Sequence, residues 1–279
     1  QFAWTPTENM EWILGVSVSE SEVNGPGWHV FGQGNNEPAG ATGYVENSDF
    51  HTLSNDFSPL SETKKAGATL HGEIGLDLFG GTTLTTITNY QVNNTQYGSD
   101  WDGQPFDIGR DTNVDDHTKQ FSQELRLASD NESNRLNWTA GFYYYSDEVE
   151  GGNLQTIFGF FDLFTEFEQD SDAWAVFANL EYRLTDQVTL RGGVRYTDEE
   201  KEVVVNSGDI FSGPTISDFR DSESWTALTG MVGLDWTPTD DVLVYVSYNR
   251  GFKSGGYNGG AFSVAFEVGP FDPEFIDAY

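Results

Sequence analysis

A short polar turn recurs along this chain, and it constrains the fold more than any other feature of the sequence. Trp4-Thr5-Pro6-Thr7-Glu8-Asn9 returns as Trp236-Thr237-Pro238-Thr239-Asp240-Asp241, with a looser copy at Tyr182-Arg183-Leu184-Thr185-Asp186-Gln187. Proline fixes φ and lacks an N–H donor, while Thr, Asp and Asn hydrogen-bond to nearby backbone, so each copy predicts a tight reversal of the chain. Each copy also ends one alternating apolar run and begins another, which indicates antiparallel hairpins.

The runs between these turns alternate with the period of a half-buried β-strand. In one of them Leu190, Val194 and Tyr196 alternate with Arg191 and Arg195. Each run is about ten residues long, which is the length of a tilted strand that crosses a membrane. Comparable runs occupy residues 10–18, 66–78, 84–92, 121–127, 136–145, 174–182, 228–236 and 242–248.

The connections at the other ends of the runs are long and rich in Gly, Asn, Asp and Ser. They cover about residues 20–65, 93–117, 146–171, 198–221 and 251–272, and we expect the third to hold a short helix or an apolar loop tip at Phe158–Phe164. Short turns on one side and long loops on the other are typical of outer-membrane barrels. The sequence therefore predicts an all-β fold, an antiparallel transmembrane β-barrel segment of about ten strands with short periplasmic turns and long extracellular loops.

Composition narrows the possible partners. Thirteen Lys and Arg against 45 Asp and Glu give a net charge of −32, which disfavours any contact with nucleic acid. The same charge would repel anionic lipid headgroups unless divalent cations bridge them to the carboxylates. Cysteine is absent, so disulfides and thiolate metal sites are excluded.

Several segments resemble the central barrel of TonB-dependent outer-membrane receptors. These segments are Phe121–Ser129, Trp138–Tyr144, Leu190–Lys201, Val244–Asn258 and Pro273–Tyr279. The resemblance covers most of the chain from about Ala66 onward. Each segment alone is only a strand with a turn, but together they are specific for the family.

The resemblance implies an active importer in the outer membrane of a Gram-negative bacterium, without enzymatic activity and without a cofactor. Such receptors bind ferric siderophores, haem, vitamin B12 or glycans outside the cell, and the TonB complex then pulls on a plug domain to admit the ligand. We expect residues 1–279 to be a partial barrel domain, with the plug, the TonB box and the last aromatic strand outside this sequence. The expected partners are a ferric siderophore or another bulky nutrient, the TonB complex and outer-membrane lipid.

Two other functions fit parts of the pattern. A small outer-membrane barrel hydrolase would place acidic catalytic residues at its rim. A soluble acidic β-protein would bind glycans, and its solubility without detergent would distinguish it from a barrel, which exposes an apolar band.

Three arginines fall on the predicted lumen face, where they would contact an anionic ligand or form ion pairs with the plug. They are Arg126, Arg191 and Arg195. The alternative is that they pair with carboxylates of the barrel wall such as Glu124 and Glu181.

A second basic pair, Arg250 and Lys253, precedes a Gly-rich loop at the predicted mouth of the barrel. These two side chains either touch the ligand or only support the start of that loop.

Aromatic side chains in the predicted external loops are further candidates, because exposed rings stack on sugars or flat chelates. They are Trp28, Trp101, Phe106 and Phe160, and the alternative is that the loops pack on one another. No metal site is expected. Asp100-Trp101-Asp102-Gly103 resembles part of a calcium loop but lacks its remaining ligands, and the histidines are scattered.

Overall fold

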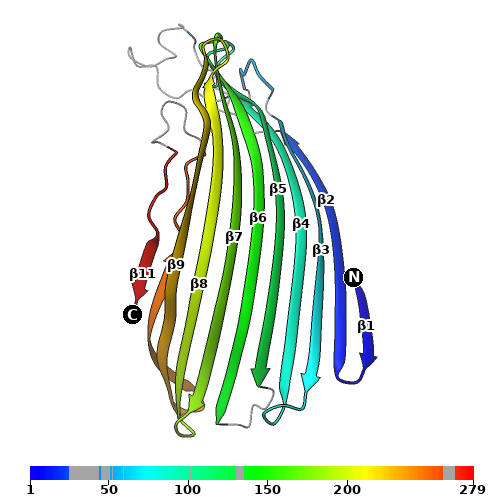
Figure 1. The fold of residues 1–279 in the computed structure, drawn as a ribbon, viewed down its shortest axis with the longest axis vertical. Coiled ribbons are helices and arrows are strands. Elements are labelled where there is room, and N and C mark those ends of the chain that lie inside the picture. The colour runs from blue at the N-terminus through cyan, green and yellow to red at the C-terminus, as the bar shows by residue number, and fades with distance from the viewer. Residues whose placement is uncertain are drawn as a thin grey trace.

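The computed structural model describes residues 1–24, 44, 51, 53–58, 60–100, 102–129, 135–259 and 268–279. They form one 11-stranded sheet in which each strand is antiparallel to the next and the spatial order follows the chain (Figure 1). Among these described residues, no helix is long and apolar enough to cross a membrane. The strands are β1 (Phe2–Thr7), β2 (Met10–Asn24), β3 (Leu60–Leu76), β4 (Thr82–Asp100), β5 (Gly109–Ser129), β6 (Leu136–Ile157), β7 (Phe161–Arg183), β8 (Val188–Asp209), β9 (Gly213–Thr239), β10 (Val242–Lys253) and β11 (Glu274–Ala278).

The recurring polar turns lie where the sequence predicted them. β1 and β2 are joined by the Glu8-Asn9 turn, and β9 and β10 by Asp240-Asp241. In the first turn the Thr7 hydroxyl donates to the Asn9 side-chain oxygen at 2.7 Å. These short connections lie at the bottom of Figure 1. The turn predicted at residues 129–134 falls mostly outside the described residues.

The opposite ends of the strands differ from the prediction, because most of the expected long loops are extended strand. β6 and β7 continue until only Phe158-Gly159-Phe160 separates them, and β8 and β9 are separated by residues 210–212. Phe158 and Gly159 have φ of 54° and 67°, so this tip is a tight turn and neither a helix nor a long loop. β2, β3, β4, β5 and β10 also extend into their predicted loops. Many of the outward residues of these extensions are polar, and where an apolar face exists, as at Val203 and Val205, it points inward and not outward, so the apolar pattern of the membrane-level runs does not continue into them.

Strand pairing sorts the side chains into two faces. Arg195 on β8 lies opposite Phe177 on β7 and Thr229 on β9, whereas Val194 lies opposite Gly230. Successive side chains of a strand point to opposite sides of the sheet. We call the side with Arg195 the inner face and the side with Val194 the outer face.

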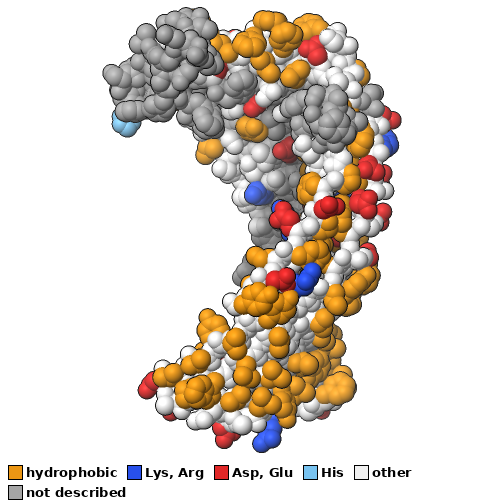
Figure 2. All heavy atoms as spheres, turned by 90° about the vertical axis from the view of Figure 1, so that its left-hand side faces the viewer, with side chains coloured by type: hydrophobic (Ala, Val, Ile, Leu, Met, Phe, Trp, Pro, Cys, Tyr) orange, Lys and Arg blue, Asp and Glu red, His pale blue; other side chains and the backbone are white. Residues whose placement is uncertain are grey.

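The outer face carries an exposed apolar band near the short turns. The sheet is bent into a crescent that is hollowed on one side, and hydrophobic side chains gather over its lower half (Figure 2). Such a band is what the hydrocarbon core of a membrane would cover. Exposed members of the band include Val16, Val18, Leu125, Phe142, Val176, Leu180, Leu190, Val194, Leu228, Val232 and Val246.

Aromatic side chains mark the upper limit of this band. Tyr90, Phe121, Tyr144, Trp174 and Tyr196 follow one another on β4 to β8, all on the outer face. The ring centroids of Phe121 and Tyr144 are 6.2 Å apart, and those of Trp174 and Tyr196 are 5.5 Å apart. We call these residues the aromatic belt, since aromatic girdles occupy the membrane interfaces of barrels.

The aromatic belt crosses the hydrogen-bonded rows of the sheet diagonally. Tyr90 and Phe121 share a row that continues through Ser146 and Asp172 to Glu200. The row therefore begins within the belt and ends at exposed carboxylates. This offset is expected, because barrel strands tilt by about 35–45°.

Above the aromatic belt the two faces exchange their character. On β8, Val203 and Val205 lie on the inner face and are fully buried, while Glu200 and Glu202 lie on the outer face and are exposed. The same alternation therefore points apolar side chains outward near the short turns and inward at the other end.

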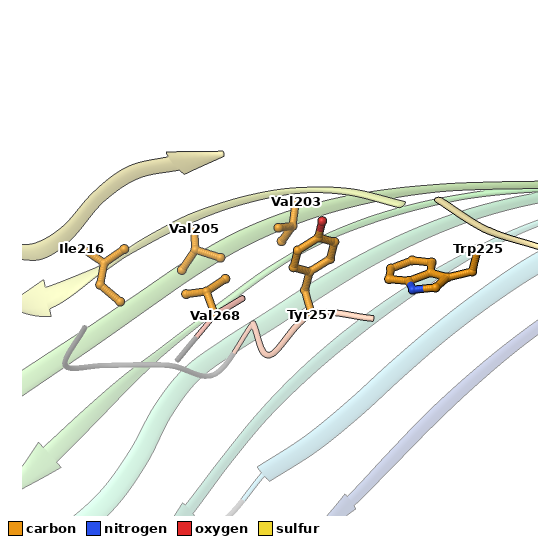
Figure 3. Close-up of a cluster of buried hydrophobic side chains, with 6 residues drawn as sticks. All are labelled: Val203, Val205, Ile216, Trp225, Tyr257 and Val268. Carbon is orange, nitrogen blue, oxygen red and sulfur yellow. The ribbon is translucent and has the colours of Figure 1, made fainter. Parts of the chain in front are cut away.

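This upper inner-face core is completed by the connection between β10 and β11. Tyr257 and Val268 of the connection cluster with Trp225 and the two valines of β8 (Figure 3). Lys201 donates a hydrogen bond from Nζ to the Gly255 carbonyl at 2.7 Å, and its Nζ lies 5.6 Å from the Trp225 ring centroid. The described parts of the connection, residues 254–259 and 268–273, thus contribute Tyr257 and Val268 to the core on the inner face.

Candidate functional site on the inner face

The three arginines predicted for the lumen lie on one face of the sheet. Arg126 lies opposite Thr85 and Gly141, and Arg191 and Arg195 are two residues of the inner face of β8. Their predicted placement on the polar face is therefore correct.

Two of these arginines are neutralised by neighbouring carboxylates. Arg126 Nη1 lies 3.3 Å from Glu124 Oε1, as the wall-pairing alternative anticipated. Arg191 Nη2 lies 2.6 Å from Asp235 Oδ1 on β9, so the partner of Arg191 is Asp235 and not the predicted Glu181. Direct ligand contact by either side chain would have to compete with these ion pairs.

Arg195 has a different environment. Its guanidinium lies 5.6 Å from the Tyr143 ring centroid and 5.8 Å from the Phe177 ring centroid. Its Nε donates to the Thr197 hydroxyl at 3.1 Å. Guanidinium groups are attracted to aromatic faces within about 6 Å, so both rings stabilise the charge in place.

A groove of about 430 Å³ runs along the inner face beside Arg195. Its lining includes Phe177 and Asn179 of β7, Met231 of β9 and Asn249 of β10. Asn179 is exposed in the groove. Tyr143, Phe177 and the two asparagines carry no signal in the sequence pattern, because only the strand register brings them to Arg195.

The two basic residues predicted for the mouth each have an acidic partner on β11. Arg250 borders the groove, but it lies opposite Gly230 and so belongs to the outer-face row. It lies 3.7 Å from Asp277 and 4.9 Å from the Phe275 ring centroid. Lys253 Nζ lies 3.5 Å from a Glu274 carboxylate oxygen. Ligand contact by Arg250 and Lys253 stays a prediction.

Two of the aromatic candidates, Phe106 and Phe160, lie at the end of the sheet farthest from the short turns. Phe106 is 47% exposed and lies edge-on to Tyr44, with ring centroids 6.5 Å apart. Phe160 is 60% exposed, with its ring centroid 4.5 Å from that of Phe161. Both rings combine a packing contact with an exposed surface, and ligand contact by Phe106 and Phe160 stays a prediction. Trp28 and Trp101 lie outside the described residues.

Three carboxylates meet where the sequence resembled part of a calcium loop: Asp100 ends β4, Asp102 follows it, and Asp56 comes from the connection between β2 and β3. One oxygen each of Asp56, Asp100 and Asp102 lies within 4.8 Å of the others. Asp100 is fully buried, and backbone amides donate to both of its oxygens, including the Gly103 amide at 3.0 Å. Asp102 accepts from the Gly109 amide at 2.6 Å. Burial is the main cause that raises the pKa of Asp102. These contacts are those of a carboxylate-organised turn.

Tyr257, in the connection that covers the upper core, is a strongly perturbed acid. Burial, followed by the negative charge of Asp221, raises the pKa of Tyr257 to about 12. The side chain therefore stays neutral at physiological pH and acts as a packing residue.

Comparison with known proteins agrees with this architecture. A family model described as TonB dependent receptor-like, beta-barrel matches residues 14–279. The ferric yersiniabactin uptake receptor FyuA of Yersinia pestis aligns with a TM-score of 0.76 and 18% identity, over 96% of this chain and 38% of that one. The closed form of the ferric-catecholate import receptor Fiu of E. coli K12 aligns with a TM-score of 0.71 and 13% identity, over 94% and 43%.

A third solved structure extends the likeness. The siderophore receptor PiuA of Acinetobacter baumannii aligns with a TM-score of 0.65 and 13% identity, over 96% of this chain and 44% of that one. The chain thus spans well under half the length of each of these three structures. The TM-scores show a common fold. At identities this low, the ligands named for these receptors are properties of those proteins and not of this chain.

Proposed function

Because the chain belongs to the TonB-dependent receptor β-barrel family, whose members lie in the bacterial outer membrane, we propose that it forms the wall of an importer for ferric siderophores. The chain is a segment of a transport receptor and not of an enzyme. Iron chelates are proposed as the ligand because the similar solved structures are described as receptors for them.

The observation that carries this proposal is the contrast between the two faces of the membrane-level strands. The outer face is apolar and ends at the aromatic belt, whereas the inner face at the same level bears arginine, asparagine and threonine side chains. A wall that is apolar toward lipid and polar toward the lumen suits the passage of a hydrophilic solute.

We further propose that the wall works with segments beyond those described. β1 and β11 each pair on one side only among the described strands, and lipid does not tolerate open sheet edges. Additional strands would close the barrel, a plug domain would fill its lumen, and the TonB complex would supply the energy for import.

The test is uptake by the full-length receptor that contains this segment. The receptor would be expressed in an E. coli strain that lacks its own ferric-siderophore receptors, with and without a functional TonB protein. Radioactive iron would be supplied as catecholate, carboxylate or hydroxamate complexes. We expect accumulation of at least one complex that is lost without TonB.

Two results would contradict the proposal. Accumulation that is equal with and without TonB would indicate a passive pore. Correct insertion into the outer membrane without uptake of any iron complex would refute the siderophore assignment, and a panel of glycans and vitamin B12 would then identify another nutrient.

A further inference from the structure

Arg195 differs from its basic neighbours on the inner face because it lacks an acidic partner. Arg126 and Arg191 each pair with a carboxylate, and Lys201 lies 3.0 Å from Glu199. Among the described residues, no carboxylate lies within ion-pair distance of the Arg195 guanidinium. An unpaired cation stands out in a chain whose net charge is −32.

The position of this cation is fixed without being neutralised. Tyr143 and Phe177 lie on two neighbouring strands, and the Thr197 hydroxyl accepts from Nε. Within the described part of the chain, no side chain or carbonyl accepts a hydrogen bond from either Nη atom, so both keep their N–H donors for another partner. A planar guanidinium held in this way can bind a carboxylate through two parallel hydrogen bonds.

The groove beside Arg195 offers space and further donors. The Asn179 and Asn249 amides lie on its wall, from β7 and β10. Gly193 also lines the groove, and a Cβ at that position would collide with the side-chain oxygen of Asn179. Cationic and amide donors around an open groove suit an oxyanion.

We propose that this groove is an oxyanion subsite within the lumen, where Arg195 binds a carboxylate or a chemically similar chelate oxygen. The inference deepens the proposed function and rests on it, since it names the charge of the group that passes the wall. The oxyanion has two possible sources, an iron chelate in transit or a carboxylate of a lumen-filling segment of the same receptor.

Arginine labelling of the full-length receptor in detergent tests this subsite directly. p-Hydroxyphenylglyoxal would be applied, and the rate of modification of each arginine followed by mass spectrometry. We expect Arg195 to react faster than the paired Arg191. Ferric citrate, an anionic carboxylate chelate, should slow the reaction at Arg195, whereas a neutral ferric trihydroxamate should not.

Variants add a binding readout. Arg195→Gln should weaken ferric citrate binding by about tenfold or more, as expected for loss of a charge-assisted hydrogen bond. Gly193→Ala should also weaken it, because the added methyl group narrows the groove while Arg195 is retained. Arg220→Gln is the matched control, since it removes the same charge from an exposed ion pair with Asp218 outside the groove.

The outcomes separate the two sources and the two proposals. Protection by ferric citrate supports a ligand in transit. Slow labelling that becomes fast only after the plug is deleted supports an internal carboxylate. Fast labelling that no anion slows, together with unchanged binding by Arg195→Gln, would overturn the subsite. TonB-dependent uptake of the neutral complex would in that case leave the proposed function intact.

Discussion

The strands of this protein pass through two regions that follow opposite rules. Below the aromatic belt, apolar side chains such as Val194 face outward and polar ones such as Arg195 face inward. Above it, Val203 and Val205 face inward and Glu202 faces outward, as in a water-soluble protein. The ladder between β7 and β8 runs through both regions without a register shift. The surroundings of each face therefore determine whether its side chains are apolar or polar. The backbone pairing is the same in both cases.

The largest effect is expected in the upper core. Trp225→Ala should lower the free energy of unfolding of this region by about 3–5 kcal/mol, because a buried indole is replaced by a cavity. Hydrogen exchange of the upper halves of β8 and β9 in the full-length receptor would measure it. Phe211→Ala, at a side chain that is 77% exposed in the connecting turn, should change stability by about 0.5 kcal/mol or less. Equal effects of the two substitutions would show that the upper region has no core.

A charge placed on the outer face should distinguish the two regions sharply. Val194→Lys, within the apolar band, should destabilise the receptor in lipid by about 2–4 kcal/mol. Glu202→Lys, on the same face above the aromatic belt, should be nearly neutral, within about 0.5 kcal/mol. Urea titration of the receptor folded into lipid vesicles would compare them. A tolerated Val194→Lys would mean that this face does not contact lipid.

The tight turn between β6 and β7 should be sensitive to backbone geometry. Gly159→Ala should cost about 1–2 kcal/mol, because φ is +67° and the new Cβ would lie 2.9 Å from the Asp107 carbonyl oxygen. Gly192→Ala, where a Cβ meets nothing within 4 Å, is the matched control. Proteolysis at the turn should accelerate only in the first variant. Unchanged proteolysis would argue for a longer, loop-like connection.

The smallest effect concerns pH and the acidic outer face above the aromatic belt. Burial, followed by the negative charges of Glu148, Glu202, Asp172 and Glu168, raises the pKa of Asp170 above 3.8. An acid whose pKa is raised by folding binds its proton more tightly in the folded state. Its contribution to the free energy of unfolding therefore increases as the pH falls through the raised pKa, and levels off below the unfolded-state value.

Asp170→Asn should accordingly reduce the gain in stability that the receptor shows on acidification from neutral pH. Denaturant titrations at several pH values would measure the difference between the two proteins. Asp240→Asn, in a short turn at the other end of the sheet, serves as a control for the loss of one carboxylate. A larger gain in the Asp170 variant would reverse the expected sign.

The membrane-level region could be predicted from the sequence, whereas the upper region could not. The alternation of Leu190, Val194 and Tyr196 with two arginines identified both faces, because lipid imposes a uniform outer surface. Beyond Asp198 the inward residues Val203 and Val205 follow a run of charged residues and are separated by a third valine, so no clear alternation marks a strand and the segment was interpreted as a loop. Its apolar partners come from the β10–β11 connection, which lies far along the chain and has no strand period.

The candidate site was predictable only in part. The inner-face position of Arg195 followed from the period of two, and so did the presence of acids that could pair with Arg126. Arg191 has an acidic partner and Arg195 has none among the described residues. This difference depends on the register between β8 and β9, which brings Asp235 close to Arg191. Phe177 reaches Arg195 through the β7–β8 register, which single-strand patterns do not contain.

The diagonal course of the aromatic belt means that residues bonded to each other across the sheet do not share a depth. Tyr90 lies in the aromatic belt at the membrane surface, whereas Glu200, in the same hydrogen-bonded row, lies above the belt. A solute that moved along the membrane normal would therefore cross the hydrogen-bonded rows at an angle. At each strand it would meet a different row, so the tilt of the strands would set the spacing of the hydrogen-bond donors along its path.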